Sequence, residues 1–136
     1  MTLDRMIVPF KPEHFKWLDA KVQVTDDELR GMARQNSWTA VLHGTVIACA
    51  GVITYWPGRH YAWAYMSPAT GQCMRWLTRE AQKRMSEPKG RVEITVRSDF
   101  EAGHRWAEML GFQMEAPIMR HYGPEGEDHT LYARVN

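Results

Sequence analysis

The sequence has few of the features that mark membrane-spanning, disulfide-stapled or zinc-binding proteins. Its longest apolar run, VIACAGVI at residues 46–53, is far shorter than the ~20 residues that span a bilayer. Only two cysteines are present, Cys49 and Cys73, with no CxxC or Cys/His spacing for a metal site or a disulfide framework. Internal repeats and low-complexity tracts are also missing. We therefore expect reduced thiols and a cytoplasmic protein.

An excess of either charge is missing too, because 17 Lys and Arg face 16 Asp and Glu, for a formal net charge of +1. A global field that draws a protein onto nucleic acid or anionic membranes is therefore not expected. The N-terminal stretch MTLDRMIVPF lacks a signal-peptide pattern. With 136 residues, 44% of them apolar, the sequence predicts one globular domain over residues 1–136.

Hydrophobic periodicity and turn residues predict a strand, two helices and three strands in the first half of the chain. Pro12 suits the first turn of the first helix, and Thr25–Glu28 is typical of a capping box that opens the second. His43-Gly44 is a tight-turn pair within a hairpin. The predicted ranges are strands at 6–10, 37–42, 45–55 and 61–66, a helix over 13–21 and a second helix through 29–33.

The second half predicts helix, strand, helix and two strands. Ser98-Asp99 offers an N-cap to the later helix, and Gly111 closes it. The predicted ranges are helices over 72–85 and 100–110, and strands at 91–97, 113–122 and 129–135. Strand, helix and strand through 61–97 imply a right-handed crossover between two parallel neighbours in an otherwise mostly antiparallel sheet. The predicted fold class is α/β (α+β), in the order β-α-α-β-β-β-α-β-α-β-β.

That order, together with the segment VRSDFEAGHRWAEMLGF at 96–112, resembles the GCN5-related N-acetyltransferase (GNAT) superfamily. The resemblance spans nearly the whole chain, and its most specific element is the helix that closes on Leu110-Gly111-Phe112. It implies a twisted, mostly antiparallel sheet whose two parallel central strands splay at their carboxyl ends. The pantetheine arm of acetyl-CoA would lie in the crevice between them. Acetyl-CoA is thus the implied co-substrate, and no metal is implied.

The resemblance also implies where coenzyme A is held. In the family, the pyrophosphate lies on backbone N–H groups at the start of the helix after the fourth strand. The implied contacts are Met66, Ala69, Thr70, Gly71, Gln72, Cys73 and Arg75. Arg75, Arg79 and Lys83 form a basic stripe, of which we interpret only Arg75 as a phosphate ligand and the rest as a solvated helix face.

Three departures separate the sequence from the family pattern. Gly71 is the one glycine in a loop that usually reads (Gln/Arg)-x-x-Gly-x-(Gly/Ala) and that is about two residues shorter here. The tyrosine that often protonates the departing thiolate corresponds to Ala107, and a frequent asparagine corresponds to Phe100. Losing the tyrosine is tolerable, since a thiolate is a fair leaving group without an acid.

Three residues are candidates for proton transfer. His60 lies beside the strand where the family places its acceptor amine, and an imidazole accepts protons at neutral pH. Glu93 can act as a base if it faces the crevice, and Tyr122 can replace the missing phenol, as can Tyr132. The alternatives are a solvated histidine, an ion-paired strand carboxylate and rim or core tyrosines. The sequence leaves both sets open.

Two functions fit this pattern. The first is an acyl-CoA-dependent N-acyltransferase, in which an amine on a small molecule or protein attacks the thioester of acetyl-CoA directly. The second is a non-catalytic interaction protein, because short phage-encoded GNAT-like proteins, such as the podoviral internal virion protein, resemble this chain in length and element order. Such a protein would act in virion assembly or bind a host protein, in the virion or the host cytoplasm. Nucleic-acid binding through the basic stripe is poorly supported at a net charge of +1.

Overall fold

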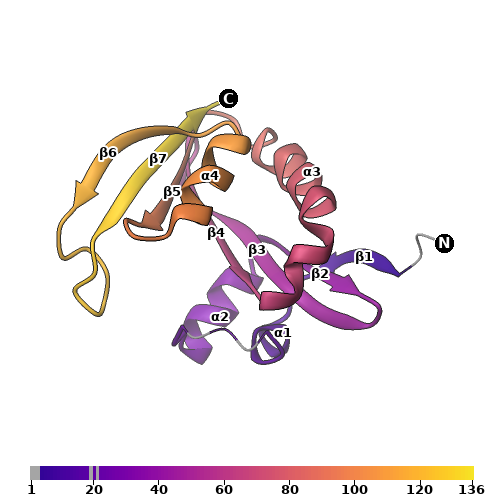
Figure 1. The fold of residues 1–136 in the computed structure, drawn as a ribbon. Helices are drawn as coiled ribbons and strands as arrows, with labels where there is room; N and C mark the ends of the chain where they lie inside the picture. The colour runs from indigo at the N-terminus through magenta and orange to yellow at the C-terminus, as the bar shows by residue number, and fades with distance from the viewer. Residues whose placement is uncertain (1–3, 19, 21) are drawn as a thin grey trace. The chain divides into compact units, whose positions relative to one another are not determined.

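The computed structural model describes residues 4–18, 20 and 22–136, and the order of its elements is the predicted one (Figure 1). The strands are β1 (Arg5–Pro9), β2 (Asn36–Leu42), β3 (Thr45–Trp56), β4 (Arg59–Met66), β5 (Arg91–Arg97), β6 (Gln113–Met119) and β7 (His129–Val135). The helices are α1 (Pro12–Lys16), α2 (Asp26–Ala33), α3 (Met74–Met85) and α4 (Glu101–Met109), with a 3-10 helix, η1 (Pro68–Cys73), before α3. The first helix was expected over 13–21, but α1 ends at Lys16 and the chain turns at Trp17 and Leu18; residues 19 and 21 lie outside the described part.

One sheet contains the seven strands in the order β1-β2-β3-β4-β5-β7-β6. The pairs β1–β2, β2–β3, β5–β7 and β6–β7 are antiparallel. The predicted parallel pair is confirmed, because β4 and β5 run in parallel with Arg59–Tyr61 opposite Arg91–Glu93. The crevice expected beyond this ladder stays a prediction. Among the described residues, no helix is long and apolar enough to cross a membrane.

Internal contacts divide the chain into two compact units. The first unit comprises Met1–Ile53 and Ala62–Leu77, and the second comprises Thr54–Tyr61 and Thr78–Asn136. The boundary cuts through β3, β4 and α3, so neither unit is a separate run of sequence. Each unit is described below by itself. The prediction of one domain over residues 1–136 stays a prediction.

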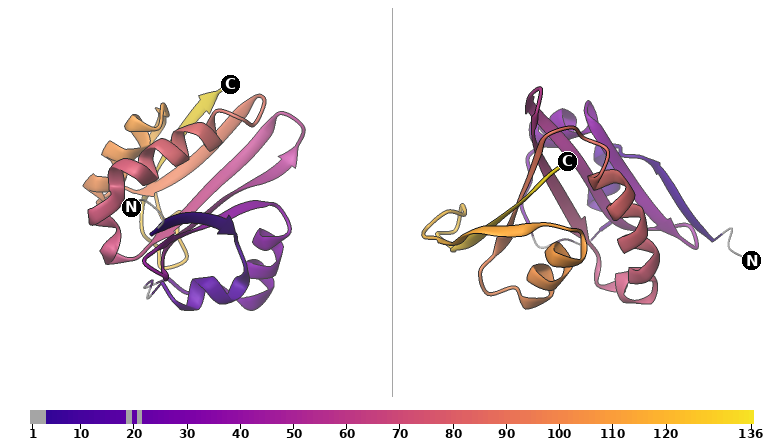
Figure 2. Two further views of the ribbon diagram at one scale, coloured as in Figure 1. Left: turned by 90° about the vertical axis from the view of Figure 1, so that its right-hand side faces the viewer. Right: turned by 90° about the horizontal axis from the view of Figure 1, so that it is seen from above.

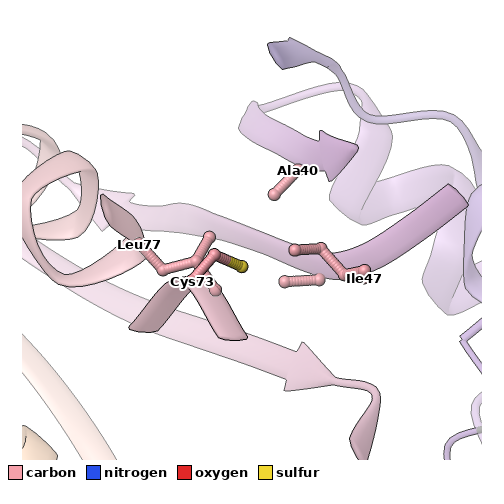
Figure 3. Packing of buried hydrophobic residues seen from close by; sticks show 5 residues of the cluster. Ala40, Ile47, Cys73 and Leu77 are labelled. Carbon is pink, nitrogen blue, oxygen red and sulfur yellow. The ribbon is translucent and has the colours of Figure 1, made fainter. Parts of the chain in front are cut away.

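The core of the first unit forms where η1 and α3 meet β2 and β3. Cys73 and Leu77 are one helical turn apart, so both side chains point toward Ala40 and Ile47 (Figure 3). Ala48 completes the buried cluster, and Ile7, Leu42, Met66, Met74 and Trp76 pack around it. Truncating a buried leucine of this kind to alanine costs about 2–5 kcal/mol. This cluster therefore fixes η1, which carries most of the predicted coenzyme A contacts.

Local signals in the first unit act as the sequence predicted. Thr25 caps α2, since its hydroxyl oxygen accepts a hydrogen bond of 3.1 Å from the Glu28 N–H. The hairpin turn between β2 and β3 has positive φ at both His43 (50°) and Gly44 (79°), as a two-residue type I′ turn requires. In this unit α1 and α2 lie side by side (Figures 1 and 2).

The second unit is built on β5, β7 and β6, with β6 and β7 joined as a long hairpin (Figure 2). Helix α4 packs against β5, and a Cβ at Gly103 would lie 2.7 Å from Val96 Cγ1, which explains the small residue there. Two boundaries differ from expectation. Strand β6 ends at Met119 because His121 adopts a positive φ of 57°. Phe100, and not Ser98-Asp99, is the N-cap of α4, because Ser98 is hydrogen-bonded to Thr130 instead.

Candidate functional site

The backbone N–H groups of Ala69 and Thr70, at the start of η1 where the sequence predicts the pyrophosphate, already donate to acceptors within the chain. The Ser67 hydroxyl oxygen accepts from the Ala69 N–H at 3.0 Å, and the Ser67 carbonyl accepts from the Thr70 N–H at 3.2 Å. Pro68 has no N–H to offer. A 3-10 helix makes i→i+3 bonds and so leaves fewer free donors than an α-helix. An anion at this end must therefore compete with the Ser67 side chain, a feature that the sequence alone did not reveal.

Gly71 is the open point of η1. A Cβ placed there would meet nothing within 4 Å, and the residue is not among those with positive φ. The fold itself therefore does not demand glycine at this position. Because the residue is exposed, its backbone can be approached closely from outside. The side chain of Gln72, the next predicted contact, lies outside what the structure describes.

Thr70 and Cys73 face the interior of the first unit. Thr70 is buried and its hydroxyl donates to the Ser67 carbonyl at 3.1 Å. Cys73 is 6% exposed and belongs to the core cluster. Burial raises the pKa of its thiol, with Arg5 acting weakly in the opposite sense. Cys73 is thus a small apolar residue of the core, and any contact it makes with a ligand must come through its backbone.

Arg75 is an exposed cation one turn beyond Gly71. Within the described part of the chain it makes no ion pair and no hydrogen bond through its side chain. The far end of the basic stripe differs, because Lys83 is 3.3 Å from Glu80, a carboxylate that Arg84 also binds at 2.7 Å. The proximal end of α3 therefore offers positive charge without an internal partner. Met66, the last residue of β4, is half-buried against the core cluster.

His60, in the second unit, has both ring nitrogens occupied. Its Nε2 lies 3.0 Å from the Lys89 carbonyl oxygen, which can only accept, so Nε2 carries the proton. Its Nδ1 lies 2.8 Å from the Thr54 hydroxyl oxygen. The ring is 9% exposed. A substrate could give His60 a proton only if one of these hydrogen bonds broke. The two bonds tie His60, in β4, to Thr54 near the end of β3 and to the segment before β5.

Glu93 is held by two arginines. Arg59 donates to both of its carboxylate oxygens, from Nε and Nη2, each at 3.1 Å, and Arg91 Nε donates at 2.6 Å. The Arg59 guanidinium, with Arg91 beside it, holds the pKa of Glu93 below its usual value, although burial opposes this. Arg91 also reaches Glu115 on β6, at 3.0 Å from Nη1. A carboxylate so stabilised as an anion is a weak base.

The two tyrosine candidates have opposite surroundings. Tyr122 is 55% exposed, lies in the loop after β6, and places its ring centroid 5.3 Å from that of His129. Tyr132 is 1% exposed and its hydroxyl lies 2.7 Å from His104 Nδ1. The His104 Nε2–H donates to the Ser98 carbonyl at 3.0 Å, so Tyr132 is the donor to Nδ1. Tyr132 is therefore an interior residue, and its burial raises the pKa of the phenol. Ala107 is also buried.

One pair of residues was missed by the sequence interpretation. His129, at the start of β7, donates from Nε2 to Glu127 Oε2 over 3.1 Å. This hydrogen bond is the main cause that lowers the pKa of Glu127. The other ring nitrogen, Nδ1, is buried and has no hydrogen-bond partner among the described residues. A histidine two residues after a glutamate in a polar loop gives no sequence signal of such a pair. No group of three or more His, Cys, Asp or Glu in the described chain is arranged to hold a metal.

Solved structures match the chain along almost its whole length. Ard1 from Thermoplasma volcanium has a TM-score of 0.78 at 13% identity, over 97% of this chain and 97% of that one. Naa50 from Arabidopsis thaliana, in complex with the bisubstrate analogue CoA-Ac-MVNAL, has a TM-score of 0.77 at 10% identity, over 98% and 99%. A GNAT-family acetyltransferase from Bacillus anthracis has a TM-score of 0.67 at 16% identity, over 97% and 95%.

The chain has the GNAT fold. At these identities the likeness is one of fold, which confirms the fold implied by the element order and the 96–112 segment. No protein-family model matches the sequence, and no curated protein matches it. The GNAT fold of this chain therefore rests on its three-dimensional arrangement, and its chemistry has to be argued from its own residues.

Proposed function

We propose that the protein is an acyl-CoA-dependent N-acetyltransferase that moves an acetyl group from acetyl-CoA to an amine. The observation that carries the proposal is the likeness over nearly all of both chains to proteins of this fold, one of them solved with a coenzyme A bisubstrate analogue. The exposed backbone at Gly71 supports it, as does Arg75, which has no ion-pair partner among the described residues, because a diphosphate needs close backbone approach and positive charge.

The coenzyme A site is proposed on the first unit, along Met66, Ala69, Thr70, Gly71, Gln72, Cys73 and Arg75. Arg75 would supply charge, and Gly71 would let the phosphates reach the backbone. The Ala69 N–H would leave the Ser67 hydroxyl oxygen and donate to the ligand instead. When bound, acetyl-CoA supplies the activated acyl group. The chain contributes positioning and one β4 backbone N–H aimed at the developing oxyanion.

The acceptor is proposed to be an amine on a small molecule or on a protein. The proton-transfer roles of His60, Glu93 and Tyr122 stay predictions. The bonds of His60 to Thr54 and Lys89, and of Glu93 to Arg59 and Arg91, favour holding roles for these two residues. Tyr122 makes no such bond within the described part of the chain, and its ring lies beside that of His129.

Calorimetric titration of the full chain with acetyl-CoA tests the proposal. Micromolar binding, followed by acetyl transfer to the peptide MVNAL or to a small primary amine, is the expected result. No heat at millimolar acetyl-CoA would reject the enzyme and favour a non-catalytic docking protein. The narrower resemblance to phage virion proteins, and with it a phage or host protein partner, stays a prediction that the structures named above do not address.

A further inference from the structure

We infer that His14 is a proton-sensitive switch: its neutral ring holds α1 on β2, and protonation of the ring frees this helix as the pH falls below neutrality. The inference concerns the first unit alone and goes beyond the proposed acetyltransferase function. His14 lies in α1, and its Nδ1 is 3.1 Å from the Lys11 backbone nitrogen and 2.7 Å from Thr39 Oγ1 on β2. One ring nitrogen therefore links the start of the helix to the sheet.

The partners of His14 Nδ1 fix its protonation state. A backbone N–H can only donate, so Nδ1 accepts from Lys11 and carries no proton. The Thr39 hydroxyl must then also donate to Nδ1, and its oxygen is left to accept from the Cys49 thiol, 3.7 Å away. Burial raises the pKa of Cys49 to about 11, so this thiol keeps its proton at neutral pH. The series of donors that begins at Cys49 ends on the lone pair of a neutral imidazole.

A proton on Nδ1 is incompatible with this arrangement. It would turn the ring nitrogen into a donor, and the Lys11 N–H would lose its acceptor. The Thr39 hydroxyl would have to turn toward Cys49, whose sulfur is a weak acceptor. Thr39 and Cys49 are both 0% exposed, so solvent does not compensate them for a lost hydrogen bond. Protonation of His14 therefore weakens the link between α1 and β2.

Helix α1 has few other contacts of its own that would hold it. It comprises the five residues Pro12–Lys16, none of which is buried (Figure 1). The apolar anchors lie outside the helix, because Phe10 is 4% exposed and Leu18 is 0% exposed. A segment with few buried apolar contacts opens locally at low cost. We therefore expect α1 to open between these two anchors while the strands of the first unit stay paired.

The surroundings of His14 favour the neutral ring. Burial lowers its pKa, Glu13 acts in the opposite sense, and Lys11 adds to the lowering. The rings of Phe10 and Trp17 lie near the imidazole, with centroids 6.2 and 5.7 Å from its own. Helix α2 packs against α1, and within the described chain its charged residues make no ion pair or hydrogen bond with the ring; they are Asp26, Asp27, Glu28 and Arg30. The hold on α1 is thus complete above the ordinary histidine pKa of about 6.5 and is lost as the pH falls through the lower folded-state pKa.

Amide hydrogen exchange of the full chain, followed by NMR from pH 7.5 to pH 5, tests the switch. The N–H groups of Lys11 and Trp17 report on the helix, since they donate to Nδ1 and to the carbonyl of His14. We expect their protection factors to fall by about 3- to 10-fold as the His14 ring titrates, while amides of β2 and β3 keep theirs. If the ring gains its proton and Lys11 stays equally protected, or if the ring gains no proton down to pH 5, the inference is wrong.

The decisive variant is His14→Gln, because a glutamine at the third position of a helix can accept from the N-cap N–H but does not titrate. Its Lys11 protection should be the same at pH 7.5 and pH 5, and a fall like that of the parent would assign the switch to another group and overturn the inference. Thr39→Val removes a donor from the neutral ring, so the pKa of His14 should rise and Lys11 protection at pH 7.5 should fall by about threefold. His43→Asn is the matched control. It removes an exposed histidine of the same unit, asparagine tolerates the positive φ there, and the pH response of the parent should remain.

Discussion

The two units use their polar side chains in different ways. In the first, the exposed Arg75 side chain makes no ion pair or hydrogen bond within the described chain, and it lies one turn beyond the exposed backbone of Gly71. In the second, both ring nitrogens of His60 and both carboxylate oxygens of Glu93 already have hydrogen-bond partners. Polar groups without internal partners mark a place for a ligand, whereas saturated ones hold strands together. Residue type alone does not tell a ligand-binding polar group from a structural one, but the hydrogen bonds and ion pairs of the folded chain do.

The largest effect is expected from Gly51→Ala in the first unit, which contrasts with the open Gly71. A Cβ at Gly51 would lie 2.7 Å from the Asn36 carbonyl oxygen and 2.7 Å from Trp63 Cζ2. Because the carbonyl oxygen belongs to the backbone of β2, relief requires a strand to move. We expect the free energy of unfolding to fall by about 3 kcal/mol, measured by urea denaturation.

Gly71→Ala is the matched control for that loss. Its added methyl meets nothing within 4 Å, so the free energy of unfolding should change by less than about 1 kcal/mol. Equal losses at Gly51 and Gly71 would contradict the contrast between a packed and an open glycine.

The second effect concerns the ion pairs of the second unit. Glu93→Gln leaves Arg59 and Arg91 without their shared anion, and charge-assisted hydrogen bonds of this kind contribute about 1.5–3 kcal/mol. We expect a loss of about 2 kcal/mol at pH 7 by urea denaturation. Glu115→Gln removes a more exposed partner, with 42% of its side chain accessible, and should cost under about 1 kcal/mol.

The Glu93 contribution should also depend on pH. Its pKa in the folded state lies below the unfolded value of about 4.3, so the stabilisation is complete above that pH. It is lost as the pH falls through the folded-state pKa, and the parent and Glu93→Gln should then converge. A constant difference down to pH 2 would show that the lost stability comes from packing and not from the charge.

The third effect tests the first unit as the coenzyme A site. Arg75→Ala should weaken coenzyme A binding by roughly tenfold, because one charged hydrogen bond is lost, and Gly71→Val should do at least as much by blocking the backbone. Calorimetry measures both. Because a Cβ at Gly71 meets nothing within 4 Å and Arg75 makes no ion pair or hydrogen bond in the described fold, their unfolding curves should stay close to that of the parent.

The smallest effect is expected at Arg79. This residue lies one turn further along α3, where screening leaves an exposed charge weak, so Arg79→Ala should change coenzyme A binding by less than about twofold. If Arg75→Ala and Gly71→Val bind coenzyme A as tightly as the parent, or if Arg79→Ala is as harmful as Arg75→Ala, the proposed phosphate site is in the wrong place.

The strands and their order were predictable because their signals are local. Strict alternation sets β5 at Arg91–Arg97, and the predicted bounds of β7 are also those observed. Ends of elements were less predictable. Strand β6 was expected to reach Tyr122, but the left-handed backbone at His121 stops it earlier, and no residue pattern announces that. The cap of α4 differs because Ser98 hydrogen-bonds to Thr130, 32 residues away.

The state of each candidate site residue was not predictable for the same reason. Glu93 meets Arg59 across 34 residues of sequence, and His60 meets Lys89 across 29. The sequence left an ion-paired Glu93 open as an alternative. It did not show which of the 17 Lys and Arg residues would be the partners. The likeness of the 96–112 segment to GNAT proteins implied the fold correctly. It gave no indication of the pair between Glu127 and His129.

The place of β7 in the sheet bears on how the chain folds during synthesis. Strand β7 follows β6 in sequence but lies between β5 and β6 in space. On the ribosome, where chains grow by about 5–20 residues per second, β5 would thus emerge well before the strand that covers its open edge. Strands β1, β2 and β3 are neighbours in the sheet in the order of synthesis, so each can pair as soon as the next one emerges. During that interval β5 exposes unpaired backbone, and the second unit depends more than the first on protection from aggregation.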